Sequence, residues 1–389
     1  MPFFRGLLTR KKRFSSASAE RRKKEHDCYL QNGSCVLKEL LALCDGNCRI
    51  PIHYYTAIEI DNAIRHSNSK MDLAYVTLVT GLLDNRTVLV RFNERTFKNI
   101  HRDIAITAQM SHLKNVLRLV GCCLEFEEAV MVYEYIEGIP LFDLLFKKVN
   151  LNGKSLCWGN RLRVARDVAS AIVFLHTEFS TPIIHRMIQP HNVIIDEKSG
   201  VAKILDFSLS ISLPPGELEV QDKVCGTMGY IAPENIASGI STQKTDVYSF
   251  GVLLFQLLIG KKVYDIIDLV VDSINSEETI DFEEDAKSNA EEGNSMDRVD
   301  STNSKETTDF KNVPTNYFVD RNIKESNVLD IVDPTILEEH GIEIQQQLKD
   351  YLDLARKCTA DNGDDRPYMI HVARELSRIE KCFRALSLG

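Results

Sequence analysis

Apolar and polar residues are arranged differently in the first and in the later parts of this chain. Four short apolar segments, separated by turns, predict strands over residues 73–80, 87–92, 117–124 and 129–134. A helical spacing of apolar residues over about 95–110 predicts one helix between the two pairs of strands. These elements indicate a small lobe that is rich in β structure.

From about residue 141 onward the spacing of apolar residues is mainly helical. It predicts a long helix near 160–177 and a strongly apolar helix near 245–259. The expected fold class is therefore α+β, with two lobes. A small, β-rich N-terminal lobe covers residues 64–136, and a larger, α-helical C-terminal lobe covers residues 137–385.

Residues 30–63 form a helical extension ahead of the two lobes. Its apolar stripe consists of Val36, Leu37, Leu40, Leu41 and Leu43. Such a stripe can dock a partner, but packing against the small lobe is the favoured interpretation.

Charge is distributed unevenly over the 389 residues, whose net charge is −9. Residues 1–29 carry nine basic and three acidic side chains and are expected to form a disordered basic tail. Such a tail is either a nuclear signal, a patch for anionic lipid at a membrane surface, or simply a solvated terminus. Residues 272–309 carry thirteen acids and three bases, so a disordered acidic insertion is expected over about 272–313.

The cysteines and the apolar runs of the chain indicate where in the cell the protein is located. The ten cysteines show no Cys-x-x-Cys spacing of the kind that binds zinc, which indicates free thiols in a reducing compartment. No apolar run reaches the roughly 18 residues that a membrane span needs. We therefore expect a cytoplasmic protein, at most attached to the periphery of the plasma membrane or imported into the nucleus through its basic tail, and no nucleic-acid partner.

Several short motifs follow one another in the order that is typical of protein kinases. They are Gly121–Glu125, Val132–Tyr135, His185–Asn192, Asp206–Ser208, Gly226–Glu234, Thr245–Gly251 and Asp365–Pro367. Over roughly residues 64–385 the chain resembles a plant receptor-like kinase domain. The resemblance implies the bilobal protein-kinase-like fold, with the hinge of the nucleotide site at Glu134 and Tyr135.

Five residues match positions that are structural in that family. The resemblance places His185 and Phe207 in a packed spine, and it makes Asp246 the anchor of the catalytic loop. It also implies that Glu234 and Arg366 pair and so tie the activation segment to the large lobe.

The catalytic positions are altered. Met187 stands where a kinase has the Asp that accepts the proton of the substrate hydroxyl, and a thioether lacks the necessary basicity. Gln189 replaces the Lys that follows. Asn192 and Asp206 match the two metal-binding positions; they could still hold Mg²⁺, although a role in local hydrogen bonds is the favoured interpretation.

The nucleotide-binding positions are altered as well. Side chains occupy all three positions of the glycines that normally cover the ATP phosphates, and these are Met71, Leu73 and Val76. Leu89 is expected to crowd the adenine slot. Arg91 replaces the Lys that pairs with the phosphates, and Arg is not equivalent to Lys. Asp103 matches the acid of the neighbouring helix, so an Arg91–Asp103 pair is predicted. No cofactor is expected beyond weak binding of ATP and Mg²⁺.

The stretch ahead of the kinase-like part sharpens the resemblance. Asn32–Ser34, Leu37–Leu41, Asp45–Gly46 and Pro51–Ile52 are similar to the small plant receptor-like cytoplasmic pseudokinases that partner an NLR immune receptor, which are related to wall-associated-kinase-type kinase domains. The resemblance implies a catalytically inactive adaptor or decoy in plant innate immunity. Its implied partners are the leucine-rich repeats of the receptor, receptor-like cytoplasmic kinases and pathogen effectors. The long acidic insertion departs from the short form of that family.

Two other functions stay open at this stage. One is a weakly active or unconventional Ser/Thr kinase that uses Asn192, Asp206 and Arg91, and the other is a nuclear or membrane scaffold unrelated to immunity. Hydroxyl groups of the activation segment are candidates for modification, or else ordinary loop residues: Ser208, Ser210, Ser212 and Thr227.

Overall fold

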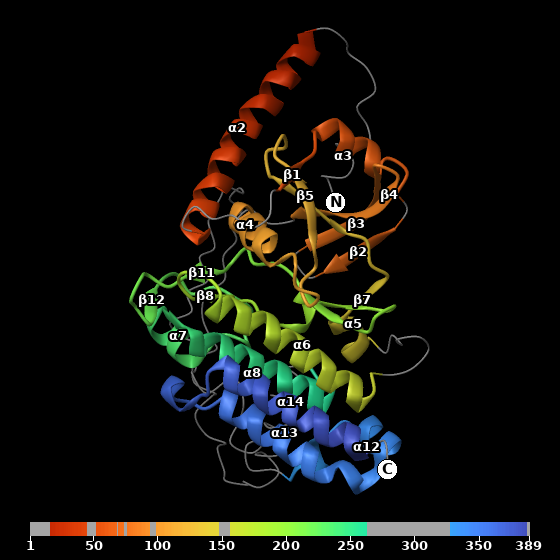
Figure 1. Cartoon of the computed structure of the whole chain (residues 1–389), viewed down its shortest axis with the longest axis vertical. Coiled ribbons are helices and arrows are strands. Elements are labelled where there is room, and N and C mark those ends of the chain that lie inside the picture. Colours follow the sequence, from red (N-terminus) through yellow and green to blue (C-terminus); the bar gives the residue numbers. More distant parts are fainter. Residues whose placement is uncertain are drawn as a thin grey trace, which may run out of the picture.

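The fold was obtained as a computed structural model, which describes residues 16–44, 52–67, 69–73, 76–93, 99–147, 156–262 and 327–386. A small lobe built around a sheet lies against a larger helical lobe (Figure 1). The expected acidic insertion at 272–313 lies outside the described residues. No helix in the described part of the chain combines the length and apolar character of a membrane span.

The N-terminal helix corrects one expectation. Residues 1–29 were predicted to be a disordered tail, but helix α2 runs without interruption from Ser16 to Cys44. It lies along one side of the small lobe (Figure 1). Polar contacts join it to the lobe. Among them are an ion pair of Arg21 with Asp61 at 3.3 Å and hydrogen bonds from the Asn32 side chain to the carbonyl oxygens of Leu124 and Phe126, each 2.9 Å.

The apolar stripe expected over residues 36–43 is only partly buried on this helix. Val36 and Leu43 are 1% and 4% exposed, whereas Leu37 and Leu41 are each 56% exposed. Glu39 faces helix α4 (Ile100–Met110), where it accepts hydrogen bonds from Asn99 and Arg102.

The small lobe contains a six-stranded sheet in the order β1-β5-β6-β4-β3-β2. The strands are β1 (His53–Tyr54), β2 (Lys70–Leu73), β3 (Val76–Leu83), β4 (Arg86–Asn93), β5 (Leu119–Cys123) and β6 (Val130–Glu134). The predicted strand over 73–80 thus corresponds to the end of β2 and most of β3. Strands β3 and β4 form a hairpin through Asp84 and Asn85, whose φ values of 49° and 58° suit a two-residue turn with left-handed backbone.

An added strand closes one edge of this sheet. β1 pairs in parallel with β5, with His53 opposite Gly121. A Cβ atom at Gly121 would lie 2.5 Å from the His53 carbonyl oxygen, so the close approach of the two backbones requires glycine there. Helix α3 (Ala57–Ile64) follows β1 and starts with a capping box of Thr56 and Glu59.

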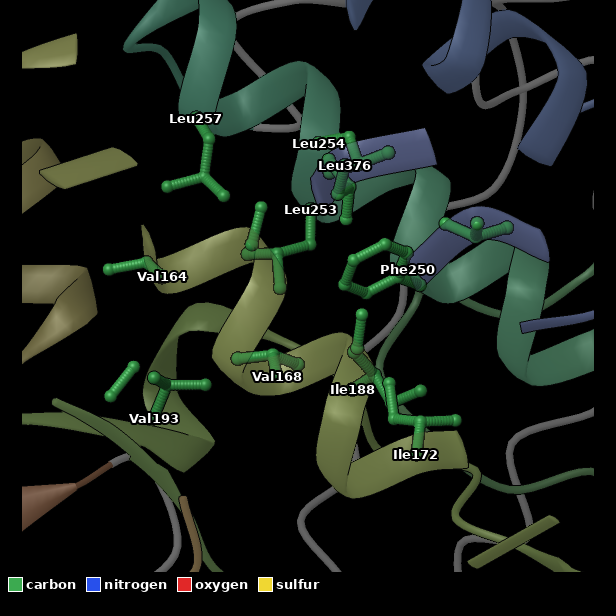
Figure 2. Packing of buried hydrophobic residues seen from close by; sticks show 14 of the residues in the cluster. Val164, Val168, Ile172, Ile188, Val193, Phe250, Leu253, Leu254, Leu257 and Leu376 are labelled. Carbon is green, nitrogen blue, oxygen red and sulfur yellow. The ribbon is translucent and has the colours of Figure 1, made fainter. Parts of the chain in front are cut away.

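The large lobe is built around long helices. These are α6 (Trp158–Thr177), α8 (Gln243–Ile259), α13 (Gln345–Cys358) and α14 (Met369–Leu386), with the shorter α5 (Leu141–Phe146), α7 (Pro233–Ser238), α11 (Val328–Ile331) and α12 (Pro334–His340). Val168 and Ile172 of α6 face Phe250 and Leu253 of α8 across the core (Figure 2). The side chains from Thr245 to Ile259 are all buried, which makes α8 the centre of this lobe.

Short strands shape the side of the large lobe that faces the small one. They are β7 (Gly138–Pro140), β8 (Ile183–Ile184), β9 (Val193–Asp196), β10 (Ala202–Ile204), β11 (Ile211–Ser212), β12 (Glu219–Gln221) and β13 (Ile240–Thr242). β11 pairs with β8, and β12 pairs with β13. The segment from Asp206 to Glu234 is therefore anchored to the large lobe at two places.

Candidate functional site

Arg91 lies at the centre of the junction between the lobes. Strand β4 carries it, and its side chain is completely buried. One terminal nitrogen of the guanidinium donates to Asp103 Oδ2 of α4 at 2.6 Å and to the hydroxyl of Tyr133 of β6 at 3.2 Å. The other terminal nitrogen donates to Asp206 Oδ1 at 2.9 Å. One side chain thus joins the sheet, the helix and the start of the activation segment.

Both carboxylates that contact Arg91 have further donors. Asp103 Oδ1 accepts from the backbone N–H of Phe207 at 3.1 Å and from the hydroxyl of Thr107 at 2.9 Å. Asp206 Oδ1 also accepts from the hydroxyl of Ser208 at 2.6 Å. The backbone of Asp206 has a φ of 71°, a left-handed conformation that a non-glycine residue keeps only when its surroundings hold it there.

Burial and charge act against each other in this cluster. Burial alone would lower the pKa of Arg91, but the nearby Asp103, Tyr133 and Asp206 raise it well above its usual value, so the guanidinium is always charged. Burial raises the pKa of Asp103, and Arg91 opposes that shift. Burial likewise raises the pKa of Tyr133, whose hydroxyl therefore stays protonated.

The apolar residues predicted to stand at the nucleotide slot are buried together. Leu73, Val76 and Leu89 are 6%, 2% and 3% exposed, and they share one buried cluster with Ile194 and Leu205 of the large lobe. Met71 packs against the same cluster. The small and large lobes therefore meet in this region through apolar contacts between side chains.

The two hinge residues differ in their surroundings. Glu134 accepts hydrogen bonds from Arg118 at 3.0 Å and from Lys203 at 2.9 Å. Tyr135 is 43% exposed.

The catalytic loop is packed against its own backbone. Met187 is 4% exposed, and its N–H lies 3.2 Å from Nδ1 of His185. The Asn192 side chain donates to the carbonyl oxygen of Met187 at 2.9 Å. The amide nitrogen of Asn192 therefore holds the loop in place. The Gln189 side chain is buried, and its Nε2 has no hydrogen-bond partner among the described residues.

The five residues expected to be structural form two groups, one of Asp246, His185 and Phe207 and the other of Glu234 and Arg366. Asp246 accepts from the backbone N–H groups of His185 and Arg186, at 2.7 and 2.9 Å. The rings of His185 and Phe207 are 5.1 Å apart. Arg366 donates to both carboxylate oxygens of Glu234, at 2.7 and 2.9 Å.

The four hydroxyl residues proposed as modification positions are not equivalent. Ser208 and Ser210 are buried, with exposed fractions of 3% and 4%. The hydroxyl oxygen of Thr227 is buried as well. Ser212 is half-buried, and its hydroxyl accepts a hydrogen bond from Arg102 at 2.5 Å.

Two features of the site were missed by the reasoning from sequence. Tyr133 lies within a recognised motif, but nothing in that motif indicates a bond to Arg91. The contacts of Arg102 with Glu39 and Ser212 join residues that are 63 and 110 positions apart, so no local pattern carries them.

Comparison with known proteins agrees with this architecture. The family model described as "Protein kinase domain" matches residues 86–375. The chain is 35% identical to Serine/threonine-protein kinase ZRK4 of Arabidopsis thaliana, over 91% of this chain and 92% of that protein. It is 32% identical to Non-functional pseudokinase ZED1 of the same plant, over 92% and 98% of the two chains.

A third relative has a different length. The chain is 30% identical to Wall-associated receptor kinase-like 1 of Arabidopsis thaliana, over 90% of this chain but only 43% of that protein. ZRK4 and ZED1, in contrast, are matched over nearly their full length, in agreement with the bilobal fold and the ordered series of motifs. The chain belongs to the protein kinase family, within the plant receptor-like cytoplasmic kinases and pseudokinases.

Proposed function

We propose that this protein is a catalytically inactive pseudokinase that serves as an adaptor or decoy in plant innate immune signalling. The observation that carries the inactive part of the proposal is Arg91, whose guanidinium is held between Asp103 and Asp206. In a kinase the position of Asp206 binds the metal ion, and here a protein cation takes that role. Several relatives bear names that describe non-functional pseudokinases.

The residues at this site do not fit Mg-ATP. Phosphates require a backbone cradle that they can approach closely, and buried Leu73 and Val76 stand at two of its glycine positions. A metal ion at Asp206 would lie next to the positive charge of Arg91, which contacts Oδ1 of that carboxylate, and the two cations would repel each other. Phosphoryl transfer depends almost wholly on positioning and electrostatic stabilisation, and Met187 supplies no proton acceptor. In this proposal the protein uses no cofactor.

Thermal unfolding in the presence of Mg-ATP tests the inactive part. We expect the melting temperature to stay the same at millimolar Mg-ATP, because a ligand that binds only the folded state would raise it. We also expect no transfer of labelled phosphate to a generic protein substrate. A rise in melting temperature together with transfer that Asp206→Ala abolishes would contradict the proposal.

The adaptor part rests on the resemblance to pseudokinases that partner NLR receptors and on an exposed face of α2. In this proposal the leucine-rich repeats of a receptor bind the protein, and receptor-like cytoplasmic kinases and pathogen effectors are further partners. Leu30, Leu37 and Leu41 are each 56% exposed and lie at helical spacings of seven and four residues. An apolar helix face of this kind suits a protein partner.

Co-purification with a receptor of the relevant clade tests the adaptor part. The double variant Leu37→Asp, Leu41→Asp should lose at least tenfold in receptor binding, because it places charges in an apolar contact. Leu82→Asp is the matched control, since Leu82 is 59% exposed on β3 and should bind normally. Retention of full binding by the α2 variant would exclude this face, and failure of the native protein to bind any such receptor would end the adaptor proposal.

A weakly active Ser/Thr kinase is the second candidate. Retention of Asn192 and Asp206 at the metal positions favours it, and two relatives are named serine/threonine-protein kinases. The Mg-ATP experiment above separates the two candidates.

A scaffold that acts in the nucleus or at a membrane, without a role in immunity, is the third candidate. Its support is the basic cluster Arg21–Lys24, where Arg22 and Lys23 are exposed on α2. Our proposal places the protein in the cytoplasm or at the periphery of the plasma membrane. Replacing Arg22 and Lys23 by Gln, together with Arg10–Arg13, should leave the protein in the cytoplasm or at the plasma membrane, and loss of a nuclear pool in this variant would favour the scaffold.

A further inference from the structure

Arg102 joins three elements of the fold that are distant in sequence. It belongs to α4, and one terminal nitrogen donates to Glu39 Oε2 of α2 at 3.0 Å. The other terminal nitrogen donates to the hydroxyl of Ser212, on β11 of the activation segment, at 2.5 Å. Glu39 also accepts from Asn99 at the start of α4, at 3.0 Å. The end of α2 is thus linked to the activation segment through one guanidinium.

The guanidinium of Arg102 has a donor left with which it can bind a further anion. Its Nε is buried and has no acceptor within the described ranges of the chain. Burial, and then the positive charge of nearby Arg186, lower the pKa of Arg102, while Glu39 raises it. Arg186 itself donates to Asp222 Oδ2 at 2.7 Å. The Ser212 hydroxyl thus contacts a guanidinium, Arg102, that is paired with Glu39 and lies near a second one, Arg186, that is paired with Asp222.

We propose that Ser212 is a phosphorylation site whose phosphate is bound by Arg102 and weakens the attachment of α2 to α4. A separate Ser/Thr kinase supplies the phosphoryl group from Mg-ATP, so this chain needs no catalytic activity. The Ser212 hydroxyl oxygen forms a bond to the γ-phosphorus as the bond from that phosphorus to the β–γ bridging oxygen breaks. ADP leaves, and the hydroxyl proton passes to the catalytic carboxylate of the donor kinase.

Access favours Ser212 over the other serines of the segment. Ser208 and Ser210 are buried, whereas Ser212 is half-buried and is followed closely by the exposed residues 214–219. Strand β11 has only two residues, so local opening of this edge costs little free energy.

The effect of the phosphate follows from its charge. A phosphoserine carries about −1.5 to −2 charges and forms short, strong bonds with guanidinium groups. It would compete with Glu39 for Arg102, and the two anions would repel each other across that side chain. Helix α2 keeps its contacts through Asn32 and Val36, so the loosening is confined to the last two turns of the helix.

Hydrogen–deuterium exchange on protein with genetically encoded phosphoserine at position 212 tests the response. We expect amides of residues 36–43 to exchange roughly tenfold faster or more, the factor that loss of one charge-assisted contact gives. Phosphoserine at Ser199, an exposed turn residue of the large lobe, is the matched control and should leave α2 unchanged. In an Arg102→Gln background, phosphoserine at 212 should have no further effect.

Three results would overturn the proposal. They are unchanged or slower exchange in α2, an equal response to the control phosphoserine, and a full response in the Arg102→Gln background.

Occupancy is tested on protein purified from its native tissue. Trypsin releases residues 204–223 as one peptide, which contains Ser208, Ser210 and Ser212. Fragmentation should place phosphate on Ser212. A peptide that is found without phosphate, or with phosphate only on the other two serines, would contradict the assignment. Neither experiment depends on receptor binding, so its outcome is separate from that of the proposed adaptor function.

Discussion

At Arg91 the difference between a guanidinium and an ammonium group determines the geometry of the site. An ammonium is a compact point charge, whereas a guanidinium is planar and presents donors in several directions. Arg91 uses them for Asp103, Asp206 and Tyr133 together. The shorter Asp103 leaves room for the longer base, so the pair survives although both side chains differ from those of a typical kinase.

Substitution of Arg91 should therefore be costly. Arg91→Ala leaves two buried carboxylates without their cation, and we expect a loss of about 3–5 kcal/mol in the free energy of unfolding. Arg91→Lys should cost less, because an ammonium can still reach one of the two. Arg118→Ala, which removes a largely exposed partner of Glu134, is the control and should cost less than about 1 kcal/mol. Urea unfolding measures all three, and equal losses for Arg91→Ala and the control would show that the network is not stabilising.

Met187 alone does not account for the loss of activity in the proposed pseudokinase. Met187→Asp should restore no measurable phosphate transfer, because Arg91 still contacts Asp206 and buried apolar residues still stand at the positions predicted to cover ATP. Transfer of labelled phosphate from ATP to a generic substrate is the measurement. Robust activity of this single variant would show that the slot admits ATP.

The identities of the site residues were accessible from sequence, whereas their contacts were not. Motif order gave Arg91, Asp103 and Asp206 their positions, and the Arg91–Asp103 pair was predicted. The bond from Arg91 to Asp206 spans 115 positions, and that from Arg102 to Ser212 spans 110. Such contacts depend on how the lobes pack, and no local spacing determines that.

Among the elements, β1 shows how the N-terminal extension becomes part of the sheet. It lies against β5 through backbone contacts, and the carbonyl oxygen of Cys122 accepts a hydrogen bond from the N–H of Tyr55 at 2.9 Å. Gly121 permits this approach. The edge of β5 is thereby covered, which removes a site of unwanted strand pairing.

Gly121→Ala should loosen that edge. The new methyl group would meet the His53 carbonyl oxygen and the Tyr55 ring, and we expect a loss of roughly 1–3 kcal/mol, the usual cost of overpacking. Gly33→Ala in α2 is the matched control, because its new methyl group would lie 3.8 Å from its nearest neighbour, Cδ1 of Leu124. That variant should gain up to about 1 kcal/mol from helix propensity. Chemical denaturation checks both signs, and a neutral Gly121→Ala would show that β1 can move aside.

The limits of prediction at this scale are clear from α2. The helices near 160–177 and 245–259 were found because their apolar residues recur regularly, and they correspond to α6 and α8. The first half of α2 is strongly charged and gave no such signal. Its contacts are polar and distant in sequence, such as Arg21 with Asp61 and Asn32 with Leu124, so the pattern indicated a disordered tail.

In the molecule as a whole, the described residues before and after the gap at 263–326 meet beside the end of α8. The N–H of Asp333 donates to the carbonyl oxygen of Leu258 near the end of α8, at 2.9 Å. Arg161 fixes the same corner, because it donates to Leu257 O at 2.8 Å and to Asp333 Oδ2 at 2.5 Å. The described residues on both sides of the acidic stretch are therefore joined by direct contacts with each other.

Replacing residues 272–313 by a linker of about ten Gly and Ser residues should leave the fold intact. Loop-closure entropy grows slowly with length, so we expect a gain of no more than about 1–2 kcal/mol in the free energy of unfolding. Thermal unfolding and urea midpoints measure the change. A large loss of stability would show that this stretch contributes to the packing of the large lobe.

Stability should also fall with mild acidification. Burial lowers the pKa values of His101, His185 and His191, and it is the largest cause for each. Between pH 7 and 5.5 these histidines become protonated in the unfolded chain, where their pKa values are near 6.5, but less so in the folded chain. The unfolded state therefore binds more protons, and the free energy of unfolding decreases as the pH falls. Urea midpoints across this range measure it. His191→Gln should make the dependence shallower, and a midpoint that rises on acidification would contradict the assignment.

The guanidinium of Arg91 also determines whether lysine-directed reagents can label this protein. Acylating nucleotide probes recognise kinases by capturing the neutral amine of the phosphate-pairing lysine. A guanidinium stays protonated at any physiological pH and offers no such amine. A proteome-wide survey with those reagents would therefore pass over this protein, even where it is abundant. Its detection calls for antibodies or affinity tags rather than activity-based labelling.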